Sequence, residues 1–291
     1  RDFAIMLAAF NQLGYSVEWR VINAADYGRA QRRRRVFFFV FRNDTKWGKR
    51  LHTKYEATLP TDVDLDTRLA CYTPYIFQDG LFARQFPVKG EAVKKRINAN
   101  KLDDDIAEVS ANFSDGKMWN SGLMTNGYYY TIETEPKGDE EPIPMKEIVV
   151  SPDQVPEEYY IDGEKSEKFK YLRGPKKITR TAANGHTYTF SEGGMSEYDS
   201  LDLPGRTMLT SEGSVNRSTH LLKIDGRYRL ITPIEAERLQ DFPDDWTRYK
   251  RNAKGEVVEV SDRMRMFFMG NALVTGIVKR IGDELQKIDA I

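Results

Sequence analysis

The stretch that decides the fold reads Gly28-Arg29-Ala30-Gln31-Arg32-Arg33-Arg34-Arg35 and continues directly into Val36-Phe37-Phe38-Phe39-Val40-Phe41. Five arginines thus stand within seven residues, immediately before six apolar ones. A charge cluster alone is typical of a solvated or disordered segment. Six consecutive apolar residues instead indicate a strand covered on both faces, as in a layered α/β sheet. We therefore expect the arginines to be held at the rim of a sheet, where ligands bind in such folds.

The segments before this stretch predict a helix and a hairpin. Residues Phe3 to Leu13 are mostly apolar and are followed by Gly14, a pattern typical of a buried helix with a glycine C-terminal cap. Residues Ser16 to Ile22 alternate between apolar and polar side chains, which predicts a strand with one covered face. The short link to the next strand holds no helical pattern, so the two strands should pair antiparallel at a sheet edge. This order fits the end of a doubly wound α/β domain.

Composition excludes several classes of protein. The chain has 291 residues, and its 44 Lys and Arg balance its 44 Asp and Glu. No apolar run approaches the roughly 20 residues of a membrane helix and no signal segment is visible, so a cytosolic protein is the default expectation. A nucleic-acid site must come from local charge, and residues 20–42 carry seven Arg against the single acid Asp26. The one cysteine, Cys71, cannot form a disulfide within the chain or a Cys-based metal site, and it is expected to be a small buried residue.

The rest of the chain is irregular until its end. Residues 43–227 are polar and rich in Gly, Pro and aromatics, and one amphipathic helix is predicted there, with apolar positions at Ala92, Val93, Ile97, Leu102 and Ile106. Thr232-Pro233-Ile234-Glu235 forms a capping box that predicts a helix start, and Phe242-Pro243 should end that helix. A final amphipathic helix is predicted after Asn271, with Asn271 as its N-cap.

Four stretches resemble, in order, the C-terminal half of the cytosine-5 DNA methyltransferases. Gln31, Arg33 and Arg35 match that family's Gln-x-Arg-x-Arg motif. Residues 229–243 are similar to the motif that braces its target-recognition region. Arg206-Thr207-Met208-Leu209-Thr210 looks like the end of a target-recognition domain, where a family Thr touches the DNA backbone. Gly270-Asn271-Ala272-Leu273-Val274 resembles the family's last motif, on the cofactor side of the catalytic domain.

The resemblance implies an α/β fold class. It would comprise the C-terminal edge of a Rossmann-like, S-adenosylmethionine-dependent methyltransferase sheet and a mixed, loop-rich target-recognition domain. Residues 1–60 would end the catalytic domain, residues 61–245 would form the recognition domain, and residues 246–291 would be a hinge and a C-terminal helix that returns to the catalytic domain.

Three catalytic motifs of the family do not occur in this sequence: the Pro-Cys nucleophile, the Phe-x-Gly-x-Gly loop and the Glu-Asn-Val segment. Cys71 follows Ala70 and lies on the wrong side of the arginine motif, so it is not the expected nucleophile. We therefore expect a piece of a longer enzyme, or one part of a split enzyme, from a prokaryote or a phage. It should be inactive without an N-terminal catalytic half.

The resemblance also implies roles for individual residues. The family is understood to flip cytosine out of duplex DNA and to add a thiolate at C6, so that C5 accepts the methyl group of S-adenosyl-L-methionine. The catalytic candidates are Arg35, which would stabilise negative charge on the attacked base, and Arg33, beside the same pocket or on a flanking phosphate. The DNA-binding candidates are Gln31, Arg33 and Thr207, the cofactor-binding candidates are Asn271 and Ala272, and no metal is expected.

Other interpretations stay open at the level of sequence. The arginines could only bind phosphates, and Asn271 could only cap a helix. The chain could be a non-catalytic DNA-binding module or a remnant of a restriction-modification methylase. An RNA-directed relative would use the same chemistry, but the long recognition region favours duplex DNA, because loops that read base edges need that additional mass.

Overall fold

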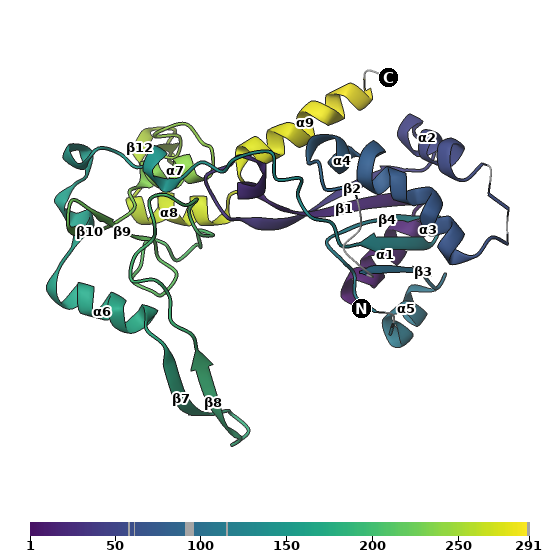
Figure 1. Ribbon diagram of the computed structural model, residues 1–291. Coiled ribbons are helices and arrows are strands. Elements are labelled where there is room, and N and C mark those ends of the chain that lie inside the picture. Colours follow the sequence, from purple (N-terminus) through teal and green to yellow (C-terminus); the bar gives the residue numbers. More distant parts are fainter. Residues whose placement is uncertain (58, 61, 91–95, 115, 290–291) are drawn as a thin grey trace. The chain divides into compact units, whose positions relative to one another are not determined.

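The computed structural model describes residues 1–57, 59–60, 62–90, 96–114 and 116–289 (Figure 1). Contacts divide the chain into two compact units. Unit 1 comprises residues 1–27, 34–140 and 277–291, and unit 2 comprises residues 28–33 and 141–276. The arginine-rich stretch is shared between them, because its part up to Arg33 belongs to unit 2 and its part from Arg34 belongs to unit 1. The functional division of the chain at residues 60 and 245 stays a prediction.

Unit 1 is built around an antiparallel sheet whose described strands follow the order β2-β1-β4-β5-β3. The strands are β1 (Tyr15–Asn23), β2 (Arg34–Arg42), β3 (Ile97–Lys101), β4 (Ser121–Thr125) and β5 (Tyr128–Ile132). The helical elements are α1 (Asp2–Gln12), η1 (Ala24–Tyr27), α2 (Lys46–Tyr55), α3 (Leu65–Pro74), η2 (Tyr75–Asp79), α4 (Leu81–Gln85), α5 (Ile106–Asn112) and α9 (Thr275–Asp289), which begins in unit 2. The predicted hairpin of β1 and β2 is confirmed, and β2 lies at the sheet edge.

Hydrophobic clusters cover both faces of this sheet. Trp19 and Met124 pack on the face covered by α1 and α5. Leu123 and Tyr130 pack on the opposite face, which α2 and α3 cover. Neighbouring residues such as Leu123 and Met124 serve opposite faces because side chains alternate along a strand. Gly122 lies against Trp19 so closely that an added Cβ would stand 2.1 Å from the indole ring.

The expectation of a single covered face on β1 is wrong. Glu18 and Arg20 are each only 2% exposed, although both are charged. Glu18 accepts hydrogen bonds from the main-chain N–H groups of Leu81 and Phe82, each at 3.0 Å, and so caps α4. Arg20 donates to the carbonyl of Phe86 at 3.0 Å. Hydrogen bonds to the main chain offset the cost of burying these charges, and the alternation of residue types could not predict them.

Two further expectations for unit 1 are also corrected. The strand after the arginines is covered at one end only, since Phe41 is 6% exposed but Val36 is 47% exposed at the edge of the sheet. The predicted amphipathic helix is instead the strand β3, followed by the separate helix α5. Pairing of β3 with β5 overrides the helical spacing. Ala92 and Val93 lie outside the described residues.

Unit 2 consists of short sheets, helices and long loops. Its strands are β6 (Tyr160–Ile161), β7 (Lys176–Thr181), β8 (Thr187–Glu192), β9 (Leu221–Ile224), β10 (Arg227–Leu230), β11 (Tyr249–Arg251) and β12 (Val257–Glu259). Its helical elements are η3 (Met145–Glu147), η4 (Pro152–Gln154), η5 (Glu157–Tyr159), α6 (Gly163–Arg173), α7 (Pro233–Leu239) and α8 (Asp262–Asn271). The sheets are β6-β10-β9, β7-β8 and β11-β12. The chain is thus a mixed α/β protein with several small sheets.

The helix signals in unit 2 are confirmed in part. Thr232 caps α7, and the reciprocal hydrogen bonds with Glu235 complete the predicted capping box. The expected N-cap role of Asn271 is wrong, because Asn271 is the last residue of α8 and the final helix begins at Thr275. A short link, residues 272–274, separates the two helices. None of the described helices has the length and apolar character needed to cross a membrane.

Candidate functional site

The loop of residues 28–33 is fixed inside unit 2 by Gln31. This side chain is fully buried. Its Nε2 donates to the carbonyl of Leu239 at 3.1 Å, and its Oε1 accepts from the main-chain N–H of Met208 at 3.1 Å. The main chain of Gln31 also pairs with that of Gly205. One amide side chain therefore links the arginine-rich loop to the end of α7 and to the segment around residue 208.

Arg33 makes a second set of main-chain contacts. It is 3% exposed, and its two terminal nitrogens donate to the carbonyls of Met208 at 2.8 Å and Gly270 at 2.9 Å. Gly270 lies in α8, where an added Cβ would be 2.4 Å from the main-chain nitrogen of Thr210. This close approach brings the carbonyl groups that Arg33 binds together. Arg33 thus joins the arginine-rich loop, the segment at 208–210 and α8.

A third contact at this loop was not predicted from the sequence. Arg29 pairs with Asp241 at 3.5 Å. Burial raises the pKa of Asp241, although Arg29 and the main-chain N–H of Gly276 partly offset that effect. An added Cβ at Gly276 would lie within 2.7 Å of both side chains, so a larger residue there would displace them. No local pattern marks Asp241, because its partner is distant in sequence.

The remaining arginines of the stretch are less buried. Arg32 and Arg34 are exposed, and Arg35 is half-buried as the second residue of β2. Arg35 donates to the carbonyl of Arg34 at 2.7 Å and lies opposite Ile22 in the sheet. Arg33 belongs to unit 2, and Arg35 belongs to unit 1.

Thr207, Asn271 and Ala272 lie near the partners of Arg33 in unit 2. Thr207 donates its hydroxyl to the carbonyl of Arg32 at 2.6 Å and is half-buried. Asn271 is exposed at the end of α8, and its amide donates to the carbonyl of Phe267 at 3.2 Å. Ala272 is half-buried in the link that follows.

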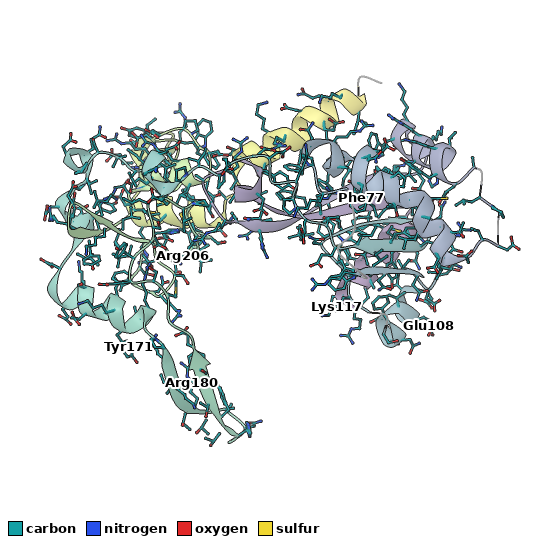
Figure 2. All side chains as sticks on the ribbon, viewed as in Figure 1. Phe77, Glu108, Lys117, Tyr171, Arg180 and Arg206 are labelled. Carbon is teal, nitrogen blue, oxygen red and sulfur yellow. The ribbon has the colours of Figure 1, made fainter. Side chains whose placement is uncertain are left out.

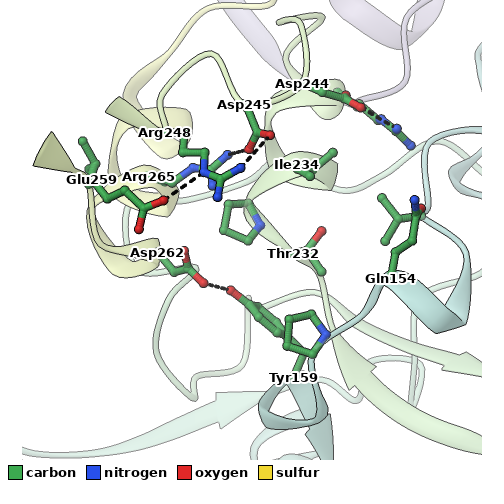
Figure 3. Close-up of a pocket in the computed structure, with 15 residues that line it drawn as sticks. Gln154, Tyr159, Thr232, Ile234, Asp244, Asp245, Arg248, Glu259, Asp262 and Arg265 are labelled. Carbon is green, nitrogen blue, oxygen red and sulfur yellow. Dashed lines mark hydrogen bonds and ion pairs between the residues drawn. The ribbon is translucent and has the colours of Figure 1, made fainter. Parts of the chain in front are cut away.

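A separate cavity in unit 2 is lined by ion pairs (Figure 3). Its volume is about 370 Å³. Arg248 bonds Glu259 at 3.1 Å, and the hydroxyl of Tyr159 donates to Asp262. Arg265 bonds Asp245 at 3.1 Å. The lining carries charges of both signs, and none of the site residues predicted from the sequence is among its described residues.

Asp199 ties several segments of unit 2 together. It accepts hydrogen bonds from Arg173 at 2.9 Å, from Arg206 at 3.1 Å and from the main-chain N–H of Leu221 at 2.9 Å. Burial by itself raises the pKa of this carboxyl. The hydrogen bond from Arg206 and electrostatic interactions with His220, Arg206 and Arg173 outweigh burial and hold the pKa well below its ordinary value.

Acid is expected to destabilise unit 2 through Asp199. A carboxyl whose pKa is lower in the folded than in the unfolded chain stabilises the fold above its unfolded pKa of about 3.9, and this contribution is lost as the pH falls further. Asp199→Asn should be less stable by about 3 kcal/mol at neutral pH. Its free energy of unfolding should then fall less steeply than that of the wild type between about pH 5 and pH 2. Urea unfolding at stepped pH measures both slopes, and parallel curves would contradict the assignment.

Two further side chains that could react or titrate are Cys71 and His220. Cys71 is a free, half-buried thiol in α3 and is less buried than expected. His220 is fully buried and contacts Glu212 at 3.0 Å. Among the residues that the structure describes, no group of three or more His, Cys, Asp and Glu side chains could hold a metal ion.

Comparison with known proteins identifies the family. Residues 1–287 match the C-5 cytosine-specific DNA methylases. The chain therefore belongs to the C-5 cytosine-specific DNA methylase family. It is 50% identical over all 291 residues to the Type II methyltransferase M.Sau3AI of Staphylococcus aureus, and it spans 63% of that relative's length. The Type II methyltransferase M.MthTI of Methanothermobacter thermautotrophicus is 36% identical over 67 residues, which make up 23% of this chain and 18% of that relative.

Proposed function

We propose that this chain is the C-terminal part of a DNA (cytosine-5) methyltransferase. The enzyme would transfer a methyl group from S-adenosyl-L-methionine to C5 of a flipped cytosine in a specific DNA sequence. Family membership over residues 1–287 is the observation that carries this proposal. Because the chain spans 63% of the Staphylococcus relative, the activity and partners of the whole protein belong to the proposal.

Arg35 is the side chain that we assign to the reacting base. Cytosine accumulates negative charge when a nucleophile adds to its ring, and a fixed guanidinium nearby stabilises that charge more in the transition state than in the ground state. The start of a strand fixes the main chain of Arg35, and its side chain is only half-buried. The exposed side chains of Arg32 and Arg34 suit DNA phosphates instead.

Gln31 and Arg33 support catalysis and DNA binding by holding the loop in place. The terminal nitrogens of Arg33 donate to carbonyl groups, and Gln31 is fully buried, so these contacts favour positioning roles for both side chains. The hydroxyl of Thr207 has one proton, and it already donates that proton to the main-chain carbonyl of Arg32. A DNA phosphate at Thr207 would therefore compete with the carbonyl of Arg32.

Asn271 and Ala272 are the residues that we assign to the cofactor. S-adenosyl-L-methionine supplies the methyl group when it is bound. The residues present fit an edge of such a site, because Asn271 is exposed and carries a polar amide at a helix end. Ala272 is half-buried in the link to α9, and its accessible surface would extend this edge. These two residues form a rim, so most of the cofactor pocket would come from an N-terminal catalytic half.

We assign DNA recognition to residues 141–245, the part of the expected recognition domain that lies in unit 2. This part holds Thr207 and two short sheets of unit 2, β6-β10-β9 and β7-β8. Duplex DNA is the proposed substrate, and the N-terminal catalytic half, in the same chain or as a separate one, is the proposed protein partner. A prokaryotic restriction-modification system in the cytoplasm is the proposed setting, since both relatives are Type II methyltransferases.

The isolated chain is expected to transfer no methyl group to DNA. Its one cysteine follows Ala70 and lacks the Pro-Cys context of the nucleophile. The measurement is incorporation of a labelled methyl group from S-adenosyl-L-methionine into duplex DNA, with and without an upstream half that contains Pro-Cys and Glu-Asn-Val. Transfer should appear only with that half.

Two outcomes would contradict this part of the proposal. Transfer by the chain alone would show that it holds its own nucleophile, and loss of that transfer in Cys71→Ser would identify the thiol. Failure of the combined halves to methylate DNA that they bind would instead favour a non-catalytic DNA-binding module.

A further inference from the structure

Strands β7 and β8 form a two-stranded ribbon of their own within unit 2. Each strand has six residues, and residues 182–186 join them through a turn in which Gly185 has a φ of +81°. Most side chains of the two strands are exposed, and the others are half-buried. Figure 1 shows the ribbon extending beyond the other elements of unit 2. The ribbon therefore contributes little to the core of this unit.

The register of the ribbon separates two chemically different faces. Thr179 lies opposite Thr189, and Thr181 lies opposite Thr187. Since side chains alternate along a strand, these residues share one face with the next pair, Lys177 and Ser191. We call this surface the hydroxyl face; it consists of Lys177, Thr179, Thr181, Thr187, Thr189 and Ser191. All six side chains are exposed, and none is a carboxylate.

The opposite face of the ribbon stabilises its shape. Ile178 lies opposite Phe190, and Arg180 lies opposite Tyr188. The guanidinium of Arg180, labelled in Figure 2, stands 3.9 Å from the centre of the Phe190 ring. Cross-strand pairs of this kind stabilise a ribbon. Because this packing uses the opposite face, the side chains of the hydroxyl face can contact another molecule.

The base of the ribbon is anchored to the rest of unit 2. Lys176 donates to the carbonyl of Leu172 at 2.7 Å and pairs with Glu192 at 3.1 Å. Arg217 donates to the carbonyl of Leu172 at 3.1 Å and pairs with the same Glu192 at 2.9 Å. The only acid of the two strands is thus neutralised, and two cations outside that ion pair remain on the strands: Lys177 and Arg180.

We propose that the hydroxyl face of the β7–β8 ribbon enters the major groove of duplex DNA and contacts base edges there. This inference rests on the proposed function. A major groove about 12 Å wide admits a two-stranded ribbon. Threonine and serine hydroxyls donate to or accept from base edges, and the threonine methyl group packs on the methyl of thymine. Short side chains let the strands approach the bases closely, and β-branching at threonine limits the rotamer freedom lost on binding.

Charge favours DNA over other occupants of this face. Phosphates flank the groove on both sides, and the ribbon offers cations with no unneutralised acid. Lys177 stands at the base of the hydroxyl face, where its long side chain can reach a phosphate. A protein partner would find six polar side chains and no apolar anchor on this face, unlike the centre of a typical protein interface.

The test compares two substitutions at adjacent positions. Thr189→Glu adds a carboxylate to the hydroxyl face, and Tyr188→Glu adds the same charge to the opposite face of the same strand. The full chain is first used to select bound duplexes from a random-sequence pool, and fluorescence anisotropy then measures affinity for the selected duplex. Thr189→Glu should weaken binding about tenfold to a hundredfold. Tyr188→Glu should weaken it by less than about threefold, because salt screens a charge that points away from the DNA.

A second measurement asks whether the contacts lie in the major groove. Replacing purines of the selected duplex by 7-deazapurines removes the N7 acceptor, which only the major groove presents. At one or more positions the wild-type chain should lose about fivefold or more in affinity, and Thr179→Ala combined with Thr189→Ala should abolish that loss. Melting of each variant without DNA verifies that the chain still folds.

The outcomes separate this inference from the proposed function. Binding of duplex DNA with equal losses in Thr189→Glu and Tyr188→Glu, or with no loss in either, would overturn the ribbon contact and leave the proposed function standing. Self-association of the DNA-free chain that only Thr189→Glu disrupts, with unchanged DNA affinity, would make the face a contact between copies and also overturn it. If the wild-type chain, alone and with its catalytic half, binds no duplex, both proposals fail.

Discussion

Replacement of Arg35 by alanine is expected to lower the turnover number of the complete enzyme about a hundredfold to a thousandfold. Its affinity for DNA should fall by less than about tenfold, because one cation among several contributes modestly to phosphate binding. The guanidinium of Arg35 is half-buried at the start of β2, so the strand restricts where its charge can lie. A charge held in place stabilises a developing anion without reorganisation at the moment of reaction.

The matched control is Arg34→Ala, which removes the same charge from an adjacent, exposed position. Neighbouring residues of a strand point to opposite sides, so Arg34 and Arg35 cannot both face one pocket. Arg34→Ala should lower DNA affinity and leave single-turnover methyl transfer at saturating DNA close to that of the wild type. Single-turnover rates and binding constants, measured with the chain and its catalytic half together, distinguish the two effects. Equal losses of rate and affinity in Arg35→Ala would reduce Arg35 to a phosphate contact.

Replacement of Glu235 by alanine should lower the free energy of unfolding of unit 2 by about 3 to 5 kcal/mol. Glu235 is fully buried, and it receives hydrogen bonds from Arg229 at 2.6 and 2.8 Å and from the main-chain N–H groups of Thr232 at 2.7 Å and Val150 at 2.9 Å. Without the carboxylate of Glu235, the guanidinium of Arg229 would stay buried with no negative partner there, since Arg229 is only 1% exposed. An uncompensated buried charge is the main cause of the expected effect.

Urea unfolding followed by tryptophan fluorescence measures this difference. Glu235→Gln keeps the shape of the side chain and several of its hydrogen bonds, so it should lower the free energy of unfolding by less than Glu235→Ala does. Glu158→Ala serves as the control, because Glu158 is an exposed acid of the same unit and its loss should change stability by less than about 0.5 kcal/mol. A loss of less than about 1 kcal/mol in Glu235→Ala would mean that water reaches Arg229 and solvates it.

Local signals predicted those parts of the fold that depend on neighbouring residues. The capping box at Thr232 predicted the start of α7, and the short link between the first two strands predicted their antiparallel pairing. Both features arise from interactions within a few residues, which a sequence displays directly. The amphipathic pattern after Asn271 likewise predicted α9, although the helix begins only at Thr275.

Features that depend on distant partners were missed. Glu18 looked like a solvent-facing residue, but its partners Leu81 and Phe82 lie more than sixty positions away. The pairing of β3 with β5 likewise overrides the helical spacing around Ile97. In the candidate site, the sequence singled out Gln31 and Arg33 through family resemblance. It did not indicate that Leu239, Met208 and Gly270 would receive their hydrogen bonds.

The acceptors that receive hydrogen bonds from Gln31 and Arg33 are peptide carbonyls, which every amino acid possesses. Evolution can therefore exchange the side chains at residues 208 and 239 for others of suitable size and still retain the attachment of the arginine-rich loop. Gly270 is different, because its lack of a side chain is itself required by the nearby Thr210. An attachment of this kind would let a methylase acquire a new target sequence while the geometry around its reacting base is inherited unchanged.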